Sequence, residues 1–265
     1  MDNRPIGIFD SGIGGLTVAR ALQQQLPNES FLYIGDTARA PYGNLSTETL
    51  LTYSHEIVGF LLQQNVKAIV LACGTTSSTV FDTLRADYPH VPMIDVVRPG
   101  VAACAALAAE KPGTRLGFIA TAATVKRGLF AQLLKEAAPG VNITSRACPL
   151  FAPIAEQGLF NGKLTRWAAN IYLAPWKNEV DVLVLGCTHY PLLAEVIAEV
   201  LPVPLINLSE STAAVVATHL TESNTQRLAK APPMHKYFSS GPEKNFSTLA
   251  EKIVNHPVTV HAFTP

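Results

Sequence analysis

Two cysteines follow apolar runs of the same kind, and thiols are groups that can move protons. Cys73 and Cys187 each stand at the end of a largely aliphatic stretch, residues 67–72 and 181–186, which is typical of a strand buried on both faces. Open α/β sheets bind ligands where the carboxyl ends of their strands meet the following helices. Two strands that each deliver a thiol to such a position are expected to place the pair across one site.

The spacing of the cysteines favours acid–base chemistry over the other uses of a thiol pair. The alternatives are inert packing, a disulfide, a metal site and a single nucleophile. The chain has four widely spaced cysteines and no C-x-x-C, which argues against a disulfide or zinc: Cys73, Cys104, Cys148 and Cys187. A single nucleophile beside His189 would leave Cys73 without a role. Cys104, which has no polar neighbours in the sequence, and Cys148 are expected to be structural.

Two thiols suit the removal of a proton from one face of a carbon atom and its delivery to the other. A thiol has a reference pKa of about 8.5, so both of its protonation states are reachable near neutral pH. Sulfurs that each approach the carbon to about 3–3.5 Å stand about 6–7 Å apart, too far to bond to each other. Each sulfur also needs a partner for its proton, and Asp10 is available to Cys73. His189 or Glu156 is available to Cys187.

A glycine-rich loop follows the first expected strand, residues 5–9. Its glycines allow a tight turn and expose N–H groups at the start of a helix, which is a ready site for an anion. A dinucleotide fingerprint is the competing interpretation, but G-x-G-x-x-G would need glycine where the chain has Thr17. The strand tip instead carries an acid and a hydroxyl, Asp10 and Ser11, so we disfavour that interpretation.

A second loop, residues 35–44, is rich in turn-forming residues. The amides of Tyr42 and Gly43 either hold a carboxylate or simply form a tight turn, and the sequence leaves both interpretations open. The helix expected after this loop starts near Ser46, which suits an N-cap, and has Glu48 in its first turn.

Strands and helices alternate along the whole chain. Strands are expected at residues 5–9, 31–35, 67–72, 93–97, 115–120, 141–147, 181–186, 203–206, 236–239 and 258–262. Helices are expected at 16–25, 46–64, 77–86, 164–174, 211–220 and 244–254, with others around Cys104, up to Ala137 and after Pro191. Two prolines are expected to interrupt regular structure in the stretch 148–158.

This alternation favours parallel sheets with helices on both faces. The near-repeat of strand, cysteine and threonine at 73 and 187 suggests two similar halves. We therefore expect an α/β fold with two similar doubly wound domains, mostly parallel sheets and an active site in the cleft between them. Residues 1–97 plus 208–265 would form the first domain, which carries Asp10 and Cys73. Residues 98–207 would form the second, which carries Cys187.

Composition narrows the classes of protein to consider. The 265 residues are 48% hydrophobic and 15% charged, which suits a compact enzyme of one or two domains and not a disordered chain. Lys+Arg and Asp+Glu balance at 20 each, so no basic footprint indicates nucleic acid. No apolar run approaches a membrane span, and the amino terminus lacks the layout of a secretory signal. We expect a cytoplasmic protein with reduced thiols, a small-molecule substrate and no metal or cofactor, and leave a homodimer open.

Four motifs of the chain resemble those of the glutamate racemases, of the aspartate/glutamate racemase superfamily. In chain order they are Asp10-Ser-Gly-Ile-Gly-Gly-Leu, Gly35-Asp-Thr-Ala-Arg-Ala-Pro-Tyr-Gly, the Cys73 stretch and Gly186-Cys-Thr-His-Tyr-Pro. The resemblance covers nearly the whole chain and includes Cys148-Pro-Leu-Phe and Tyr237-Phe-Ser. It implies two α/β domains with the active site between them. It also implies an isomerase that interconverts L- and D-glutamate without a cofactor, for peptidoglycan synthesis.

The resemblance further implies roles for individual residues. Cys73 and Cys187 would be the two acid–base residues, and Asp10, His189 and Glu156 would assist them. A larger set would hold the substrate: Asp10, Ser11, Tyr42, Gly43, Gly74, Thr75, Thr121, Thr124, Thr188 and His189.

Gly74 departs from the family pattern, which has asparagine between the cysteine and the threonine. An amide side chain could hydrogen-bond the charged groups of the substrate, a contribution of about 1.5–3 kcal/mol that glycine cannot make. Two alternatives follow: racemisation of another acidic amino acid such as aspartate, and binding of an amino acid or a protein partner without efficient turnover. If glutamate is the substrate, Gly74→Asn is expected to raise kcat/KM about tenfold.

Overall fold

The computed structural model describes residues 1–265, except for the side chain of Asn245, and its strands form two sheets. The larger sheet contains β1 (Ile6–Asp10), β2 (Phe31–Gly35), β3 (Ala68–Leu71), β4 (Met93–Asp95), β9 (His235–Ser239) and β10 (Val260–Ala262). The smaller sheet contains β5 (Arg115–Ala120), β6 (Asn142–Ala147), β7 (Val182–Leu185) and β8 (Leu205–Asn207). Their strand orders are β10-β9-β2-β1-β3-β4 and β6-β5-β7-β8. The described strand pairs run parallel, which confirms the expected α/β fold class.

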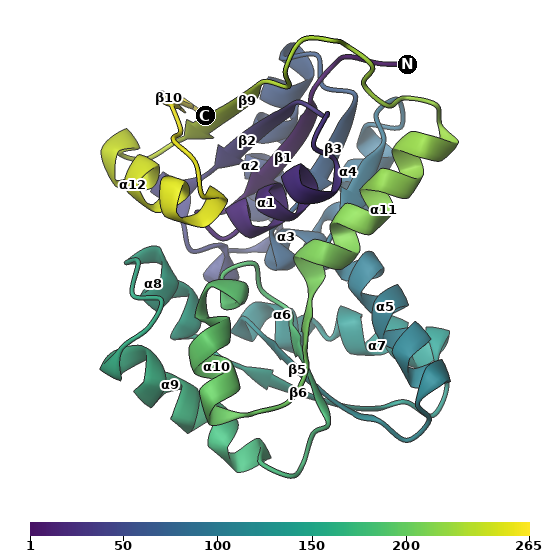
Figure 1. Cartoon of the computed structure of the whole chain (residues 1–265), viewed down its shortest axis with the longest axis vertical. Coiled ribbons are helices and arrows are strands. Elements are labelled where there is room, and N and C mark those ends of the chain that lie inside the picture. Colours follow the sequence, from purple (N-terminus) through teal and green to yellow (C-terminus); the bar gives the residue numbers. More distant parts are fainter.

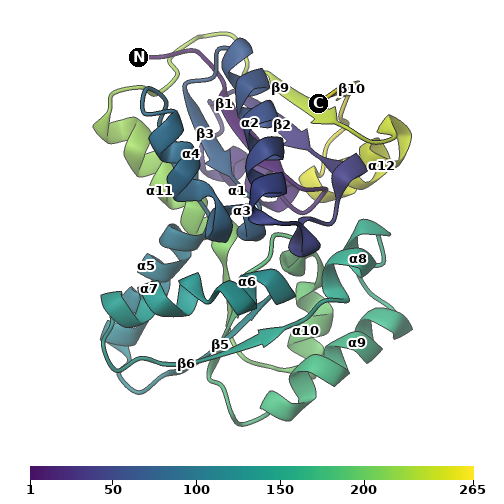
Figure 2. The same cartoon turned by 180° about the vertical axis from the view of Figure 1, so that it is seen from behind.

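Helices cover both faces of each sheet (Figure 1). They are α1 (Leu16–Gln25), α2 (Thr47–Gln63), α3 (Gly74–Thr79), α4 (Phe81–Asp87), α5 (Val97–Glu110), α6 (Ala122–Arg127), α7 (Leu129–Ala137), α8 (Phe151–Glu156), α9 (Lys163–Leu173), α10 (Ala194–Val200), α11 (Leu208–Glu222) and α12 (Glu243–Val254). Figure 2 shows the face of the larger sheet that carries α2 and α4, while α1, α11 and α12 lie on the opposite face in Figure 1. Among the described residues, no helix has the length and apolarity to cross a membrane.

Successive residues of each strand contribute to the apolar cores on opposite faces of its sheet. Ile6 and Ile8 of β1 belong to the cluster that packs with α1 and α11, whereas Phe9 belongs to the cluster on the α2 face. In the smaller sheet, Phe118 faces the α5 and α7 side and Ile119 faces α9 and α10. Because successive side chains of a strand point to opposite faces, an apolar run with few polar interruptions is what such a doubly covered sheet requires.

Two helices begin earlier than the sequence predicts. The helix expected over 77–86 starts at Gly74, directly after Cys73, and is broken at Val80 into α3 and α4. The strand expected over 93–97 ends at Asp95, and α5 begins at Val97, where a carboxylate oxygen of Asp95 accepts the N–H of Arg98 in the first helical turn at 2.9 Å.

The stretch 148–158 also differs from the prediction, which was an interruption of regular structure by two prolines. Residues 151–156 form the helix α8, with Pro153 as its third residue. The N–H groups of the first helical turn have no partner within the helix, so the N–H that proline lacks is not needed there. Cys148 is fully buried, which fits the structural role expected of it.

The two sheets draw their strands from different parts of the chain. The larger sheet uses strands within residues 6–95 and 235–262, and the smaller sheet uses strands within 115–207. The division of the chain into domains at 1–97 plus 208–265 and at 98–207 stays a prediction.

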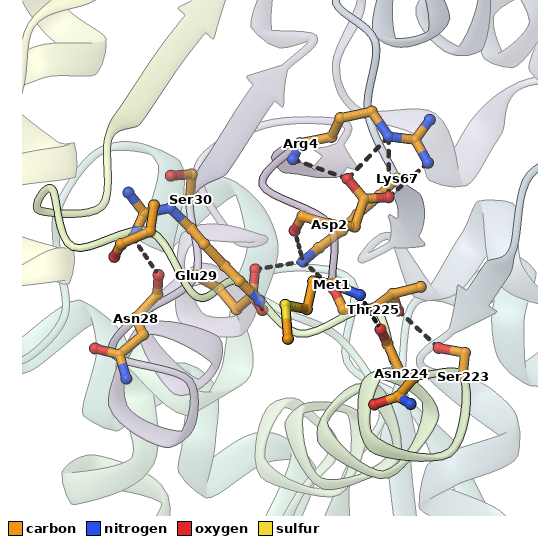
Figure 3. A network of polar contacts seen from close by, with 12 residues as sticks. Met1, Asp2, Arg4, Asn28, Glu29, Ser30, Lys67, Ser223, Asn224 and Thr225 are labelled. Atoms are coloured by element: carbon orange, nitrogen blue, oxygen red, sulfur yellow. Dashed lines mark hydrogen bonds and ion pairs between the residues drawn. The ribbon is translucent and has the colours of Figure 1, made fainter.

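A polar network ties four segments of the chain together at the amino-terminal edge of the larger sheet (Figure 3). Nζ of Lys67, which precedes β3, lies 2.6 Å from a carboxylate oxygen of Glu29, and both side chains are buried. The same ammonium donates to the carbonyl oxygens of Asp2 at 3.0 Å and Thr225 at 2.7 Å. Glu29 also accepts the N–H of Arg227 at 2.8 Å. This end of the sheet is therefore fixed by a fully engaged buried cation, away from the strand tips that carry the thiols.

Candidate active site

The strands β1, β3, β5 and β7 end at one cavity of about 430 Å³. Because β1 and β3 belong to the larger sheet and β5 and β7 to the smaller one, both sheets contribute to its walls. The predicted site residues other than Asp10 line this cavity: Ser11, Tyr42, Gly43, Cys73, Gly74, Thr75, Thr121, Thr124, Glu156, Cys187, Thr188 and His189. The structure thus brings together the residues that the separate sequence motifs indicate.

Asp10 lies behind the cavity wall, fully buried at the end of β1. Its Oδ2 accepts the N–H groups of Gly12 at 3.2 Å and Gly15 at 2.9 Å, and its Oδ1 accepts the hydroxyl of Thr188 at 3.3 Å. Burial raises the pKa of Asp10, and the nearby His189 opposes this effect. Asp10 therefore holds the glycine loop in shape and links it to the tip of β7.

Cys187, His189 and Glu156 form a hydrogen-bonded chain. Sγ of Cys187 lies 3.6 Å from Nδ1 of His189, and Nε2 of His189 lies 2.6 Å from Oε1 of Glu156. Burial lowers the pKa of His189, but the hydrogen bonds and the charges of Cys187 and Glu156 together outweigh burial and raise the pKa above its ordinary value. A protonated imidazole beside the sulfur stabilises a thiolate, so Cys187 has a partner that can take and return its proton.

Glu156 reaches this chain from α8 because the opposing loop has no side chain in the way. A Cβ on Gly12 would lie 2.0 Å from Oε1 of Glu156, so only glycine permits the approach. The same oxygen accepts the N–H of Ile13 at 2.9 Å, a bond between the loop after β1 and the helix after β6. The side chain of Glu156 is 25% exposed, so this carboxylate is partly buried.

Cys73 has different surroundings. It is the N-cap residue of α3, and its Sγ lies 3.8 Å from the hydroxyl oxygen of Ser11. Burial raises the pKa of Cys73, and the charge of Asp10 raises it further. No hydrogen bond joins Asp10 to Cys73 among the described residues, so the expected pairing of these two groups acts through charge alone.

Threonine hydroxyls connect the two sheets beside the thiols. The hydroxyl oxygens of Thr75, after β3, and Thr121, after β5, lie 3.2 Å apart. Thr121 caps α6 and lies 2.9 Å from the hydroxyl oxygen of Thr124. These hydroxyls face a cavity whose described lining contains neither lysine nor arginine, so hydroxyl and N–H donors are the groups that could hold a carboxylate.

The loop 35–44 forms the tight turn that the sequence allows, with a 3₁₀ turn at Tyr42–Asn44. The hydroxyl of the buried Tyr42 donates to Asp36, and Arg39 pairs with the same carboxylate at 2.6 Å. The hydroxyl of Ser240 donates to its other oxygen at 2.6 Å. Asp36 therefore holds this loop against the segment that follows β9.

Sequence reasoning missed the apolar wall of the cavity. It is formed by the glycine loop, α8, the segment before α12 and α12 itself, through Ile13, Ala152, Pro153, Pro242, Phe246 and Leu249. Only helical periodicity marks α12 in the sequence, and periodicity does not say that the apolar face of a helix also borders a ligand cavity. All six wall residues are apolar, so no reactive side chain marks them in the sequence.

Gly74 proves to be a point of close approach between the two thiol segments. A Cβ at this position would lie 2.8 Å from the carbonyl oxygen of Gly186, the residue before Cys187. Cβ atoms do not tolerate such a contact with backbone, so any side chain here must displace one of the two segments that carry the thiols. The expectation that Gly74→Asn raises kcat/KM is therefore replaced by its opposite.

Gly74→Asn and Gly74→Ala are both expected to lower kcat/KM, by about tenfold, because either Cβ changes the position of one thiol relative to the other. Steady-state rates of racemisation of both variants measure this. Alanine is the matched control, since it adds the Cβ without the amide. An increase for asparagine together with a decrease for alanine would show that hydrogen bonding outweighs the steric effect.

The relatives of this chain by sequence are racemases, which agrees with a cavity that holds two thiols. The sequence model described as Asp/Glu/Hydantoin racemase matches residues 12–218. A protein from Streptococcus thermophilus named glutamate racemase is 40% identical over 264 residues, which are 98% of this chain and 96% of the relative. A glutamate racemase from Streptococcus pneumoniae is 38% identical over 98% of each chain.

Solved structures show the same similarity. A glutamate racemase from Francisella tularensis in complex with D-glutamate superposes with a TM-score of 0.91 at 33% identity, covering 100% of this chain and 98% of the other. A glutamate racemase isoform from Bacillus anthracis gives the same score, identity and coverage. The sequence match and the shared fold lead to one conclusion: this chain is a member of the Asp/Glu/Hydantoin racemase family, and so an amino-acid racemase.

Proposed function

We propose that the protein interconverts L- and D-glutamate by proton transfer between two thiols and the α-carbon, and that its D-glutamate serves peptidoglycan synthesis. The observation that carries the proposal is the cavity onto which two thiols project from strand tips of different sheets. The substrate is inferred from relatives named glutamate racemase and from the Francisella tularensis structure with D-glutamate.

In the proposed reaction, one sulfur takes the α-proton as a thiolate and becomes a thiol. The other thiol gives its proton to the opposite face of the carbon and becomes a thiolate, so one turnover exchanges the roles of Cys73 and Cys187. His189 stabilises the thiolate of Cys187 while the pair is in that state, and Glu156 orients its imidazole. The hydroxyl groups of Thr75 and Thr188 are candidates to hold the carboxylates of the substrate.

Solvent exchange tests the proton transfers. In deuterated water, the product enantiomer is expected to carry deuterium at Cα, because the proton that it receives comes from a thiol equilibrated with solvent. Chelators and removal of pyridoxal phosphate are expected to leave the rate unchanged, since two thiols account for both proton steps. Mass spectrometry of the product and chiral chromatography give the readouts. A rate that depends on an added divalent metal or on pyridoxal phosphate would exclude the two-thiol mechanism.

The same assay with both enantiomers of glutamate and of aspartate tests the substrate. Glutamate is expected to be converted in both directions, with aspartate far slower. Faster turnover of aspartate would reassign the substrate, and binding of either amino acid without conversion would show a binding protein. Rescue of a bacterial strain that requires D-glutamate for growth tests the role in the cell wall.

A further inference from the structure

The two thiols differ in the groups that surround them. Cys187 has a titratable partner, His189, at 3.6 Å. Cys73 donates toward the hydroxyl of Ser11 at 3.8 Å, and within the described part of the chain it hydrogen-bonds no group that could take its proton. A thiolate at Cys73 must therefore be stabilised by hydrogen-bond donors that do not titrate. In the structure Ser11 accepts from the thiol of Cys73, so it serves the protonated form.

Thr76 is a buried donor that nothing else uses. It is 0% exposed and lies one helical turn after Cys73, as the third residue of α3. Its hydroxyl has no hydrogen-bond partner among the described residues. Buried threonines and serines in helices commonly donate to the carbonyl four residues before, as Thr212 does to Leu208 at 2.7 Å and Ser54 to Leu50 at 2.7 Å. Thr76 does not, so its hydroxyl stays free for the thiol.

The groups that face Cys73 act in opposite directions. Burial raises the pKa of its thiol first of all, and the charges of Asp10 and Cys187 raise it too. The hydroxyl and the N–H of Thr76 both lower it. Tyr33 and Tyr42 also feel the charge of Cys73, but burial raises the pKa of both phenols, which keeps them neutral. Thr76 is thus the neighbour whose dipoles favour the charged form.

We propose that Thr76 is a positioning residue for Cys73, whose hydroxyl turns to donate to the sulfur when the thiolate forms. The thiol would then donate to Ser11 and the thiolate would accept from Thr76, one partner for each state. The inference rests on the proposed function, in which Cys73 must carry a charge for half of each cycle.

Alkylation of the full-length protein tests the proposal without substrate. Iodoacetamide labels thiolates, and mass spectrometry of the peptides follows Cys73 and Cys187 separately across a pH series. In Thr76→Val, which keeps the shape and removes the hydroxyl, the midpoint for Cys73 is expected to rise by about one pH unit. The curve for Cys187 is the internal control and is expected to stay in place. Thr76→Ser restores a donor and is expected to restore the midpoint.

Activity provides a second readout. Because the equilibrium constant of a racemisation is one, kcat/KM must fall equally for both enantiomers. A fall of about 3- to 10-fold at neutral pH is expected for Thr76→Val, since a smaller thiolate fraction is partly offset by a stronger base. Thr76→Ser is expected to recover the activity.

Three results would overturn the proposal. One is an unmoved Cys73 midpoint in Thr76→Val, a second is an equal shift in the serine and valine variants, and a third is a shift of Cys187 together with Cys73. If the valine variant does not fold, Thr76→Ala against Thr76→Ser gives the same contrast. Thr212→Val, which removes a buried hydroxyl elsewhere, is the matched control for fold. Alkylation is read without glutamate, so failure of the proposed function would appear separately, as a wild-type protein that does not racemise it.

Discussion

Replacing either Cys73 or Cys187 with alanine is expected to abolish racemisation in both directions. Each turnover needs one sulfur to remove a proton and the other to supply one, so neither thiol can work alone. General acid–base groups contribute about 10²- to 10⁴-fold, and the loss is expected to be of that order or larger. The remaining thiol still faces one side of the α-carbon, so slow exchange of deuterium into a single enantiomer is expected to survive. Chiral chromatography and mass spectrometry together measure both effects.

Cys104→Ala is the matched control for this experiment. Cys104 is also fully buried, but it lies in α5 and burial alone raises its pKa to about 12, which keeps it an uncharged thiol. The variant is expected to retain most of its activity. Near-full racemisation in Cys187→Ala would show that the second thiol only packs, and the proposed mechanism would then be wrong.

Replacing Glu156 with glutamine is expected to lower kcat/KM by about 10- to 150-fold, the equivalent of one hydrogen bond between charged groups. Glutamine keeps an oxygen that can accept from the N–H of Ile13, so the fold of the loop is retained while the charge beside His189 is lost. Glu156 raises the pKa of His189, so its loss lowers that pKa. The imidazolium form disappears as pH rises through the pKa, and the alkaline limb of the pH–rate profile is therefore expected to move to lower pH.

Glu199→Gln provides the comparison on the surface. Glu199 pairs with Arg166 at 2.8 Å, and both side chains are about half exposed, so its removal takes away an ion pair that contributes little. Its pH–rate profile is expected to match that of the wild-type protein. An alkaline limb that stays in place in Glu156→Gln would show that the contact with His189 does not tune the imidazole.

The fold and the polar half of the site were predictable for local reasons. An apolar run ending abruptly in Asp10, Cys73 or Cys187 marks a buried strand and its tip, and parallel strands put their tips on one edge. The apolar wall depends instead on how α8 and α12, 87 residues apart between Glu156 and Glu243, come to border the same cavity. No local sequence pattern predicts that these two helices border one cavity.

The same distinction explains two of the predictions that changed. Pro153 was expected to interrupt structure, yet the effect of a proline depends on which turn of a helix it occupies. Gly74 was expected to lack a hydrogen bond to the substrate, yet its neighbour is Gly186, which follows a strand of the other sheet, and no sequence pattern reveals this close approach. In both cases the residue type marked a position of structural importance, but the neighbouring residues in the fold determined its effect.

The strand order has a consequence for how the chain is synthesised. The inner strand β2 pairs with β1 on one side and with β9 on the other, and β9 leaves the ribosome about 200 residues after β2. Throughout that interval one edge of β2 has no strand to pair with, and unpaired edges are where nascent chains aggregate. Phe246 and Leu249 follow β9 in the chain, so the cavity around the thiols gains this part of its apolar wall only after β9 has been synthesised. A nascent chain that stops before β9 would carry both thiols, but its larger sheet would be unfinished and its site would lack the wall that α12 provides.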